Sequence, residues 1–528
     1  MNYIYLKTKQ LIQNQTVLVG LVLILTFGVR TYYVFQKEGL HLDEVLSVIL
    51  SSYNDYSWFS NYDEDKIYTG KELKEITLFD NSSIKNALKD VYFLRLENRD
   101  RPHTNLYYSL LRLWFTGTQT GDIHRIIVQG CLLNLLFFSL SFFFMYKLLK
   151  LLFKNKWIIL LALVVAFLNV GSISNTLYIR PYQLQETIFI LFVYLFVHFY
   201  QKIELKKPID SWQNLLLIAL IVSLTLLSGY FAIFLVFFFG VFLLYKLYKE
   251  KQIKNIYFII SAFVSAIVLT FAIFPRYERG FLTYKGKEAI SKFIEGNPMD
   301  NLLLSLKRLI ETLHENLFYT STLLLLCVVF CYLLWEKRQN LHTMFKRLKI
   351  LPIILLISLM WVSVVMIAAP IKTLSYIFPA IPLLSLFIPY IILKINKPKI
   401  FVLSLLFCIG IYGVVAFNKE RISFLFLDTY KEMKFNQNPE IPVIIYNNTA
   451  LWKSASLIPY VADNQKYEFP HSDKSLFEKA MKYPKAILLI ETSTDIDIKN
   501  VFDNYVVEKF DFGYSAFFTA YYIVKKTE

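Results

Sequence analysis

Long apolar runs recur along this 528-residue chain as far as about residue 417, with polar connectors between them. Most of them approach the ~20 residues that a helix needs to cross about 30 Å of hydrocarbon. The sequence therefore predicts an all-α polytopic membrane protein with about 11–12 transmembrane helices. The expected spans are Thr16–Val34, Ile126–Tyr146, Trp157–Val170, Thr187–Tyr200, Asn214–Leu227, Phe231–Tyr245, Ile256–Phe274, Leu317–Leu334, Ile350–Ala369, Thr373–Leu393 and Ile400–Phe417.

The positive charge of the chain has a distribution that is typical of membrane topology. The formal net charge is +16, which alone would be compatible with nucleic-acid binding. Lys and Arg, however, gather in alternate connectors, as the positive-inside rule expects of cytoplasmic loops. We therefore predict that the bilayer is a partner and that nucleic acid is not. The basic connectors are Lys147–Lys156, Lys202–Asp210, Lys246–Lys254, Glu336–Lys349 and Lys394–Lys399.

If the basic connectors face the cytoplasm, a long first loop (36–104) and everything after Asn418 lie outside. Abundant Lys, Ile, Phe and Asn are typical of an AT-rich bacterial genome, so the expected location is a bacterial cytoplasmic (inner) membrane. The segment Asn105–Phe115 is apolar but contains Arg112. We interpret it as an interfacial or re-entrant helix, with a twelfth span as the alternative.

The chain is predicted to form two domains, a transmembrane domain (1–417) and an outer α/β domain (418–528). Short strand-like runs and helical spacings alternate in the second domain, as in a small soluble α/β fold. The expected strands are Pro442–Tyr446, Ala486–Ile490, Val506–Phe512 and Ala516–Val524, and the expected helices are Ala450–Val461 and Ser475–Met481.

Two adjacent carboxylates, Asp43 and Glu44, follow the first span directly. A carboxylate at the membrane surface is tolerated far better than one at the midplane and suits a partly desolvated base. The alternative is an ordinary helix start, where Asp and Glu are favoured by capping and by the helix dipole. The following Leu42–Tyr53 reads as an amphipathic helix on the membrane surface, with Leu46 and Leu50 on its apolar side.

Several cations are predicted on the same outer side as the two carboxylates. Arg101 and His103 end the first loop, Arg180 lies in a later outer connector, and Lys372 lies in a tight outer turn. Arginine can hold a phosphate through a bidentate fork. Anchoring at the interface by Arg, Lys and Tyr is the alternative.

Taken together, the carboxylates and cations indicate a site that binds an anionic lipid headgroup and removes a proton from another molecule. A transporter would place charges at mid-membrane, on broken helices. The centres of the predicted spans, by contrast, are nearly free of charge.

In its ordered motifs the chain resembles the GT-C glycosyltransferases of glycosyltransferase family 39, the branch of protein O-mannosyltransferases and lipid A aminoarabinose transferases. The resemblance covers residues 1 to about 395. The segments that carry it are His41-Leu-Asp43-Glu44, Arg101-Pro-His-Thr-Asn-Leu-Tyr107-Tyr108, Gly121-Asp-Ile-His-Arg125, Ser174-Asn-Thr-Leu-Tyr178-Ile-Arg180-Pro-Tyr182 and Lys372-Thr-Leu-Ser-Tyr376-Ile-Phe-Pro379-Ala-Ile-Pro382.

The resemblance implies transfer of a sugar from a polyprenyl phosphate to an extracytoplasmic glycan, lipid or protein, with inversion. Asp43 would be the catalytic base and Glu44 would shape the site. A phosphodiester already leaves readily, so no cofactor is required; a divalent metal is conceivable, but the sequence offers no ligand set. The residues that would bind substrate are Arg101, His103, Tyr107, Arg180, Tyr182, Lys372 and Tyr376.

Two rival functions stay open at this point. A transporter or flippase of a lipid-linked saccharide would use the same outer cations without any covalent transfer. A polytopic scaffold would depend on the tail after Asn418 and not on the charges of the outer loop.

Overall fold

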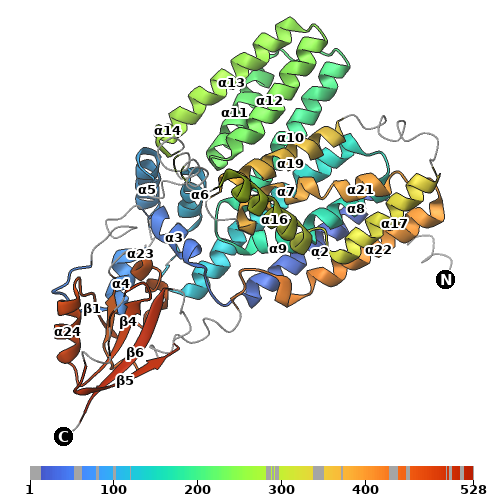
Figure 1. The fold of residues 1–528 in the computed structure, drawn as a ribbon. Helices are drawn as coiled ribbons and strands as arrows, with labels where there is room; N and C mark the ends of the chain where they lie inside the picture. Colours follow the sequence, from blue (N-terminus) through green and yellow to red (C-terminus); the bar gives the residue numbers. More distant parts are fainter. Residues whose placement is uncertain are drawn as a thin grey trace, which may run out of the picture. The chain divides into compact units, whose positions relative to one another are not determined.

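The computed structural model describes residues 14–52, 62–78, 83–98, 103–118, 120–280, 287, 291, 297–336, 350–369, 373–426, 438–447, 452–494, 496, 498, 502–511 and 517–526. Helices dominate as far as residue 416, and a sheet follows (Figure 1). The chain divides into two compact units. We call the first the helical unit (Met1–Tyr33, Arg101–Tyr107, Asn134–Ser423) and the second the mixed unit (Val34–Asp100, Tyr108–Leu133, Phe424–Glu528).

Eight segments of the described chain are long and apolar enough to cross a membrane, which confirms a polytopic helical protein. Their apolar side chains cover the helices on most sides, as expected where lipid replaces water. The segments are α2 (Gln15–Gln36), α7 (Ile123–Leu152), α10 (Tyr182–Glu204), α12 (Ala232–Lys249), α13 (Ile253–Ile273), α19 (Leu351–Ala368), the run Leu374–Ile392, and α22 (Pro398–Ala416).

Two bent helix pairs raise the number of possible spans to ten. One pair is α8 (Lys156–Phe167) with α9 (Val170–Leu177), bent by 53°. The other joins α16 (Pro298–Asn316) to α17 (Thr320–Glu336), with a bend of 94° between Met299–Asn316 and α17. The remaining predicted span corresponds to α11 (Trp212–Ser228), which at 17 residues is shorter than the ~20 needed. By length and composition, the described chain therefore offers eight to ten spans, fewer than the eleven that were predicted.

The run Leu374–Ile392 is not a regular helix, because prolines interrupt it. It comprises a 3₁₀ segment, η2 (Leu374–Ala380), followed by α20 (Ile381–Leu384) and α21 (Phe387–Ile392). Pro379 lies inside η2 and Pro382 lies in the first turn of α20, and each lacks the backbone N–H that would extend an α-helical ladder. A further short helix, α14 (Tyr277–Arg279), follows α13.

The segment expected to be interfacial or re-entrant forms α6 (Leu106–Trp114). Nine residues rise only about 13 Å, so this helix is too short to cross the hydrocarbon. Arg112, whose charge argued against a membrane span here, is buried. Its Nε atom donates a 2.6 Å hydrogen bond to the carboxylate of Asp90 in α5 (Ile84–Leu96). Burial lowers the pKa of Arg112 although Asp90 opposes that effect.

The mixed unit contains a six-stranded sheet in the order β1-β3-β2-β4-β6-β5. Strands β3, β2 and β4 are parallel, whereas β1, β6 and β5 pair antiparallel to their neighbours. The strands are β1 (Tyr68–Thr69), β2 (Val443–Tyr446), β3 (Lys466–Glu468), β4 (Lys485–Glu491), β5 (Tyr505–Phe510) and β6 (Phe518–Lys525). The expected strands correspond to β2, β4, β5 and β6; β1 and β3 had not been predicted.

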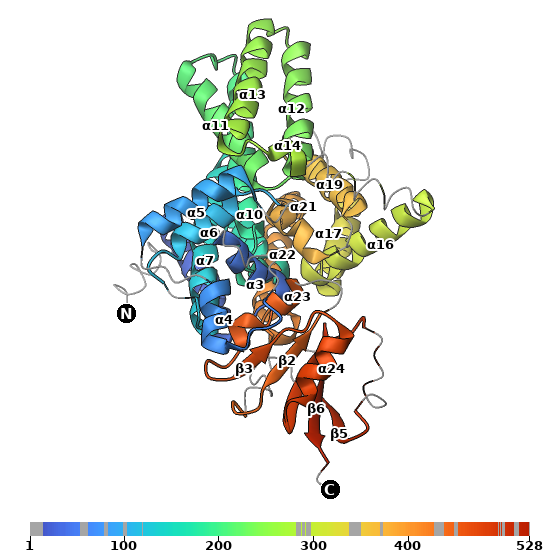
Figure 2. The ribbon, with the colours of Figure 1, turned by 90° about the vertical axis from the view of Figure 1, so that its left-hand side faces the viewer.

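One face of this sheet is covered by α24 (Asp473–Met481), as Figure 2 shows. Leu476 and Ala480 of α24 pack on Ile444, Leu488 and Ile523 of the sheet, forming its core. The expected helix Ala450–Val461 is in fact two short turns, α23 (Trp452–Ala455) and η5 (Ile458–Tyr460).

A segment of the first loop belongs to this sheet. Tyr68 of β1 pairs with Tyr467 of β3, and α4 (Gly70–Thr77) follows immediately. Gly70 approaches the carbonyl oxygen of Ala462 so closely that a side chain there would collide with it. The C-terminal sheet is therefore completed by a segment nearly 400 residues earlier in the chain.

The helix expected to lie on the membrane surface is α3 (Leu42–Ser51), and that expectation of its environment is wrong. Nearly every residue of α3 is buried in protein. Leu42, Leu46 and Leu50 form a small core with Phe517 of the C-terminal region. The apolar stripe that suggested contact with lipid is thus buried against protein side chains.

Candidate functional site

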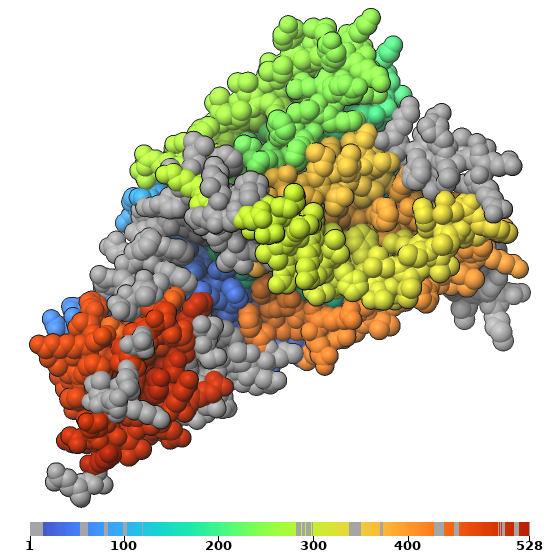
Figure 3. Space-filling view, viewed as in Figure 1, coloured from blue at the N-terminus to red at the C-terminus, as the bar shows by residue number. Residues whose placement is uncertain are grey.

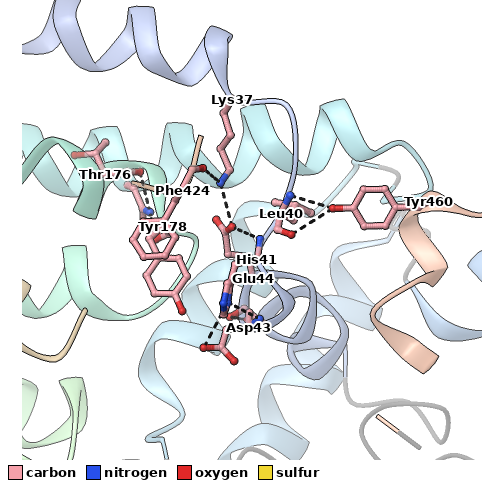
Figure 4. Close-up of polar contacts among 11 residues, drawn as sticks. Lys37, Leu40, His41, Asp43, Glu44, Thr176, Tyr178, Phe424 and Tyr460 are labelled. Carbon is pink, nitrogen blue, oxygen red and sulfur yellow. Dashed lines mark hydrogen bonds and ion pairs between the residues drawn. The ribbon is translucent and has the colours of Figure 1, made fainter. Parts of the chain in front are cut away.

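The two adjacent carboxylates lie in the first turn of α3 and have different surroundings (Figure 4). Glu44 is fully buried, and its Oε2 atom is 3.0 Å from the ammonium of Lys37. The same oxygen accepts a hydrogen bond of 2.6 Å from the backbone N–H of His41, the residue that caps α3. Glu44 therefore fixes the start of α3 and neutralises a buried lysine.

Asp43 points away from this buried pair (Figure 4). Its side chain is 41% exposed, and its Oδ2 atom is 3.7 Å from Nδ1 of His41. Successive side chains diverge by about 100° around a helix, which is why neighbours can have such different environments. Of the two carboxylates, Asp43 is the one that a substrate in solution could reach.

A distant segment of the chain holds the residues before α3. The ammonium of Lys37 donates to the carbonyl of Phe424 at 2.6 Å. The ring of Phe426 stacks on His41 with centroids 6.2 Å apart. Phe424 and Phe426 both have positive φ, 68° and 52°, a conformation that is rare for bulky residues and collects at functional sites. Nothing local in the sequence indicated this contact.

In the helical unit, Arg180 lies in the turn between α9 and α10. Its Nη2 atom is 2.7 Å from Nε2 of His103, and the arginine is only 5% exposed. A guanidinium can only donate, so this imidazole nitrogen must accept and His103 carries its proton on Nδ1. The structure thus brings together two of the residues predicted to bind a phosphate.

Aromatic rings surround the same turn. Tyr182 stacks on Tyr178 at 5.9 Å with an interplanar angle of 8°, and Tyr376 contacts Tyr182 edge-on at 6.1 Å. Asn134 of α7 donates to the carbonyls of Thr176 and Tyr178, at 3.1 and 2.8 Å. Asn134 thus holds the backbone that precedes Arg180, and the tyrosine rings pack against one another on either side of it in the sequence.

The other predicted substrate-binding residues are not part of a described cluster. Tyr107 is buried in α6. Arg101 and Lys372 lie outside the described residues.

Sequence reasoning overlooked two charged residues toward the ends of candidate spans, one in α2 (Gln15–Gln36) and one in α10 (Tyr182–Glu204). Arg30 of α2 is fully buried and donates to Thr176, Ser172 and the carbonyl of Phe167. Glu186 of α10 is also fully buried and accepts from Asn175 and Gln183. An arginine inside the first apolar run was the available signal, because intramembrane charges usually serve a purpose.

The described residues contain no group of three His, Cys, Asp or Glu side chains placed to hold a metal ion. Comparison of the chain with family models, curated proteins and solved structures gives no match in any of the three. The functional assignment therefore depends on the geometry of the two clusters and on the motifs in the sequence.

Proposed function

We propose that the protein is a membrane glycosyltransferase that moves a sugar from a polyprenyl-phosphate donor to an extracytoplasmic acceptor. The observation that carries the proposal is the contrast between the exposed Asp43 and the buried, ion-paired Glu44. A helix start needs only the capping carboxylate. Placing a second, accessible carboxylate beside it suits a residue that acts on a substrate.

In the proposed reaction, a hydroxyl oxygen of the acceptor attacks the anomeric carbon of the donor sugar. The bond from that carbon to the phosphate oxygen breaks on the opposite face, so the configuration inverts. Asp43 accepts the hydroxyl proton, and polyprenyl phosphate departs with the bonding electron pair. Glu44 acts indirectly, by holding the backbone of His41 and hence the start of α3.

Charge builds on the departing phosphate, and cations held in place beforehand stabilise it. Arg180 is the described residue best suited to this role, because His103 and the fixed turn already restrict its side chain. Arg101 and Lys372 are further candidates from the sequence. Tyr182 and Tyr376 would form an aromatic wall beside the guanidinium.

The proposed location is a bacterial inner membrane, with the transferase chemistry and the sheet outside the cytoplasm. The distribution of basic connectors supports this orientation, since the five alternate connectors named above are rich in Lys and Arg. The spans themselves serve to hold the hydrocarbon chain of the donor within reach of the charged residues at their outer ends.

The proposal is tested by incubating the purified protein with radiolabelled polyprenyl-phosphate sugars and a membrane extract. Movement of label from the donor to a new product is the expected result, and it identifies donor and acceptor class together. Label that stays on the donor, across a panel of sugars, would contradict the proposal.

One observation favours a second candidate, a flippase for a lipid-linked saccharide. Arg30 and Glu186 are ionisable groups inside candidate spans, where such residues often mark a transport path. Their hydrogen bonds to neighbouring helices instead suit a fixed structural network. In liposomes, movement of the labelled donor across the bilayer without chemical change would favour the flippase.

A further inference from the structure

A polar cavity lies in the helical unit, and Arg180 is not among the residues that line it. Its volume is about 880 Å³, within the ~300–1,000 Å³ usual for ligand sites. It forms where the chain bends sharply between α16 and α17, beside the end of α22. The helices α17 and α22 pack against each other, and in Figure 3 their yellow and orange atoms lie side by side.

The cavity keeps its shape through buried tyrosines at this bend. Tyr319 donates to the carbonyl of Asn316 at 3.1 Å and accepts from the backbone N–H of Val170 at 2.9 Å. Tyr412 of α22 donates to the carbonyl of Leu317 at 2.6 Å. Because the floor is fixed before any ligand arrives, little ordering cost opposes binding.

The polar lining suits a ligand with many hydroxyl groups. Carboxylates of Glu315 and Glu420 can only accept hydrogen bonds when ionised, whereas the amides of Asn316 and Asn418 can both donate and accept. The hydroxyl of Ser321 adds a further partner, and the hydroxyl of Thr320 lies 3.1 Å from Nε2 of His314, which also lines the cavity. Such a mixture matches the alternating donors and acceptors around a sugar ring.

The charges in the lining argue against a phosphate as the ligand. Glu315 and Glu420 are both acidic, and they oppose the favourable charge of Arg421. An anion here would be repelled by two carboxylates, and like charges brought together cost free energy. A donor phosphate therefore fits the Arg180 turn better than it fits this cavity.

One wall of the cavity is apolar and continues into the exposed apolar side of α22. Val414 lines the cavity and is 76% exposed. Phe407 and Leu403, seven and eleven residues earlier on the same helical stripe, are also exposed. A hydrocarbon chain lying along this stripe would place its headgroup in the polar part of the cavity.

We infer that this cavity binds the saccharide headgroup of an uncharged membrane glycolipid, and that this glycolipid is the acceptor. The second half of the inference rests on the proposed glycosyltransferase function. The first half, glycolipid binding, stands on the cavity alone. Among the three classes of acceptor that the sequence left open, the geometry thus points to a lipid.

The test uses the full-length protein in phosphatidylcholine nanodiscs with a photoreactive diglucosyl diacylglycerol as the probe. The isosteric double variant Glu315→Gln/Glu420→Gln removes both carboxylates, and Glu311→Gln, an exposed position on the same helix, is the matched control. We expect the double variant to weaken probe binding at least tenfold and the control to leave it unchanged. Cross-linked peptides should include Thr320–Ser321 or the segment around Asn418.

Two outcomes would overturn the inference. One is equal probe binding by the double variant, together with cross-links elsewhere on the chain. The other is displacement of the probe by polyprenyl phosphate at lower concentrations than by unlabelled glycolipid, which would make the cavity a donor site. Asp43→Asn should bind the probe normally, so a failure of the transfer assay alone would leave the cavity assignment intact.

Discussion

The start of α3 and the Arg180 turn both hold charged groups, but they do so in opposite ways. At α3 the buried Glu44 is used for structure and its neighbour Asp43 is left 41% exposed. At the turn, Arg180 itself is buried and is held directly by His103. The first region presents an exposed carboxylate beside a buried ion pair, whereas in the second region the charged side chain is itself buried and hydrogen-bonded.

Because of this difference, mutations of Asp43 and of Arg180 should have different consequences for folding and for chemistry. Removing Asp43 should affect chemistry and leave folding intact, because Glu44 and Lys37 make the structural contacts. Removing Arg180 should affect both, because its hydrogen bond to His103 helps to order the turn. Structural and chemical roles should therefore be separate at the start of α3 and combined at the Arg180 turn.

The largest effect is expected at Arg180. Arg180→Gln should lower the transfer rate about 10²–10³-fold, as for loss of one preorganised donor to a developing anion. Arg180→Lys should recover part of that loss, since it restores the charge without the planar fork. Initial rates of label transfer measure both variants, and Arg308→Gln, which removes an exposed arginine, is the control. Equal rates for Arg180→Gln and the control would remove Arg180 from the proposed mechanism.

A second effect, on stability, is expected at Glu44. Glu44→Gln leaves Lys37 buried without its ion pair, and breaking one partner of a buried pair costs about 3–5 kcal/mol. The unfolding temperature in detergent should fall accordingly. Adding Lys37→Met should restore part of the loss, because the uncompensated charge is then gone. A Glu44→Gln protein as stable as the wild type would show that the ion pair does not hold α3.

The third and smallest effect is a pH dependence in the mixed unit. The backbone N–H of His471 and the hydroxyl of Ser475 lower the pKa of Glu64. A lowered folded-state pKa gives stability that is present above the ordinary pKa of the carboxyl and is lost as the pH falls through the folded value. Because Glu64 is partly exposed, the contribution should be only about 0.5 kcal/mol.

Unfolding temperatures of the wild type and of Glu64→Gln, measured from pH 6 down to pH 3, test this effect. The two proteins should differ most near pH 6 and converge in acid. A difference that grows as the pH falls would show that the sign of the linkage is wrong.

Much of the fold was predictable because the signal is local. The apolar run Ile256–Phe274 corresponds closely to α13, since continuous hydrophobicity over a helical length is enough to identify such a segment. The pair β5 and β6 followed from two short apolar runs around a turn.

What sequence reasoning missed depends on contacts between distant residues. Strand β1 is only two residues long and exists because β3 offers it an edge. The environment of α3 was misjudged because its apolar stripe does not reveal that Phe517 covers it. In the candidate site, His103 pairs with Arg180, 77 positions later in the chain. The contacts of Phe424 and Phe426 with the residues before α3 join segments that are even farther apart in the sequence.

The central claim is that the exposed carboxylate at the start of α3 accepts a proton during sugar transfer. Its most direct test compares the label-transfer rates of Asp43→Asn and Glu75→Gln, which remove the same charge from α3 and from the exposed face of α4. We predict a loss of at least about 100-fold for Asp43→Asn, the lower end of the range for a general base, with unchanged unfolding temperature. Asp43→Asn that transfers label as fast as Glu75→Gln would contradict the account.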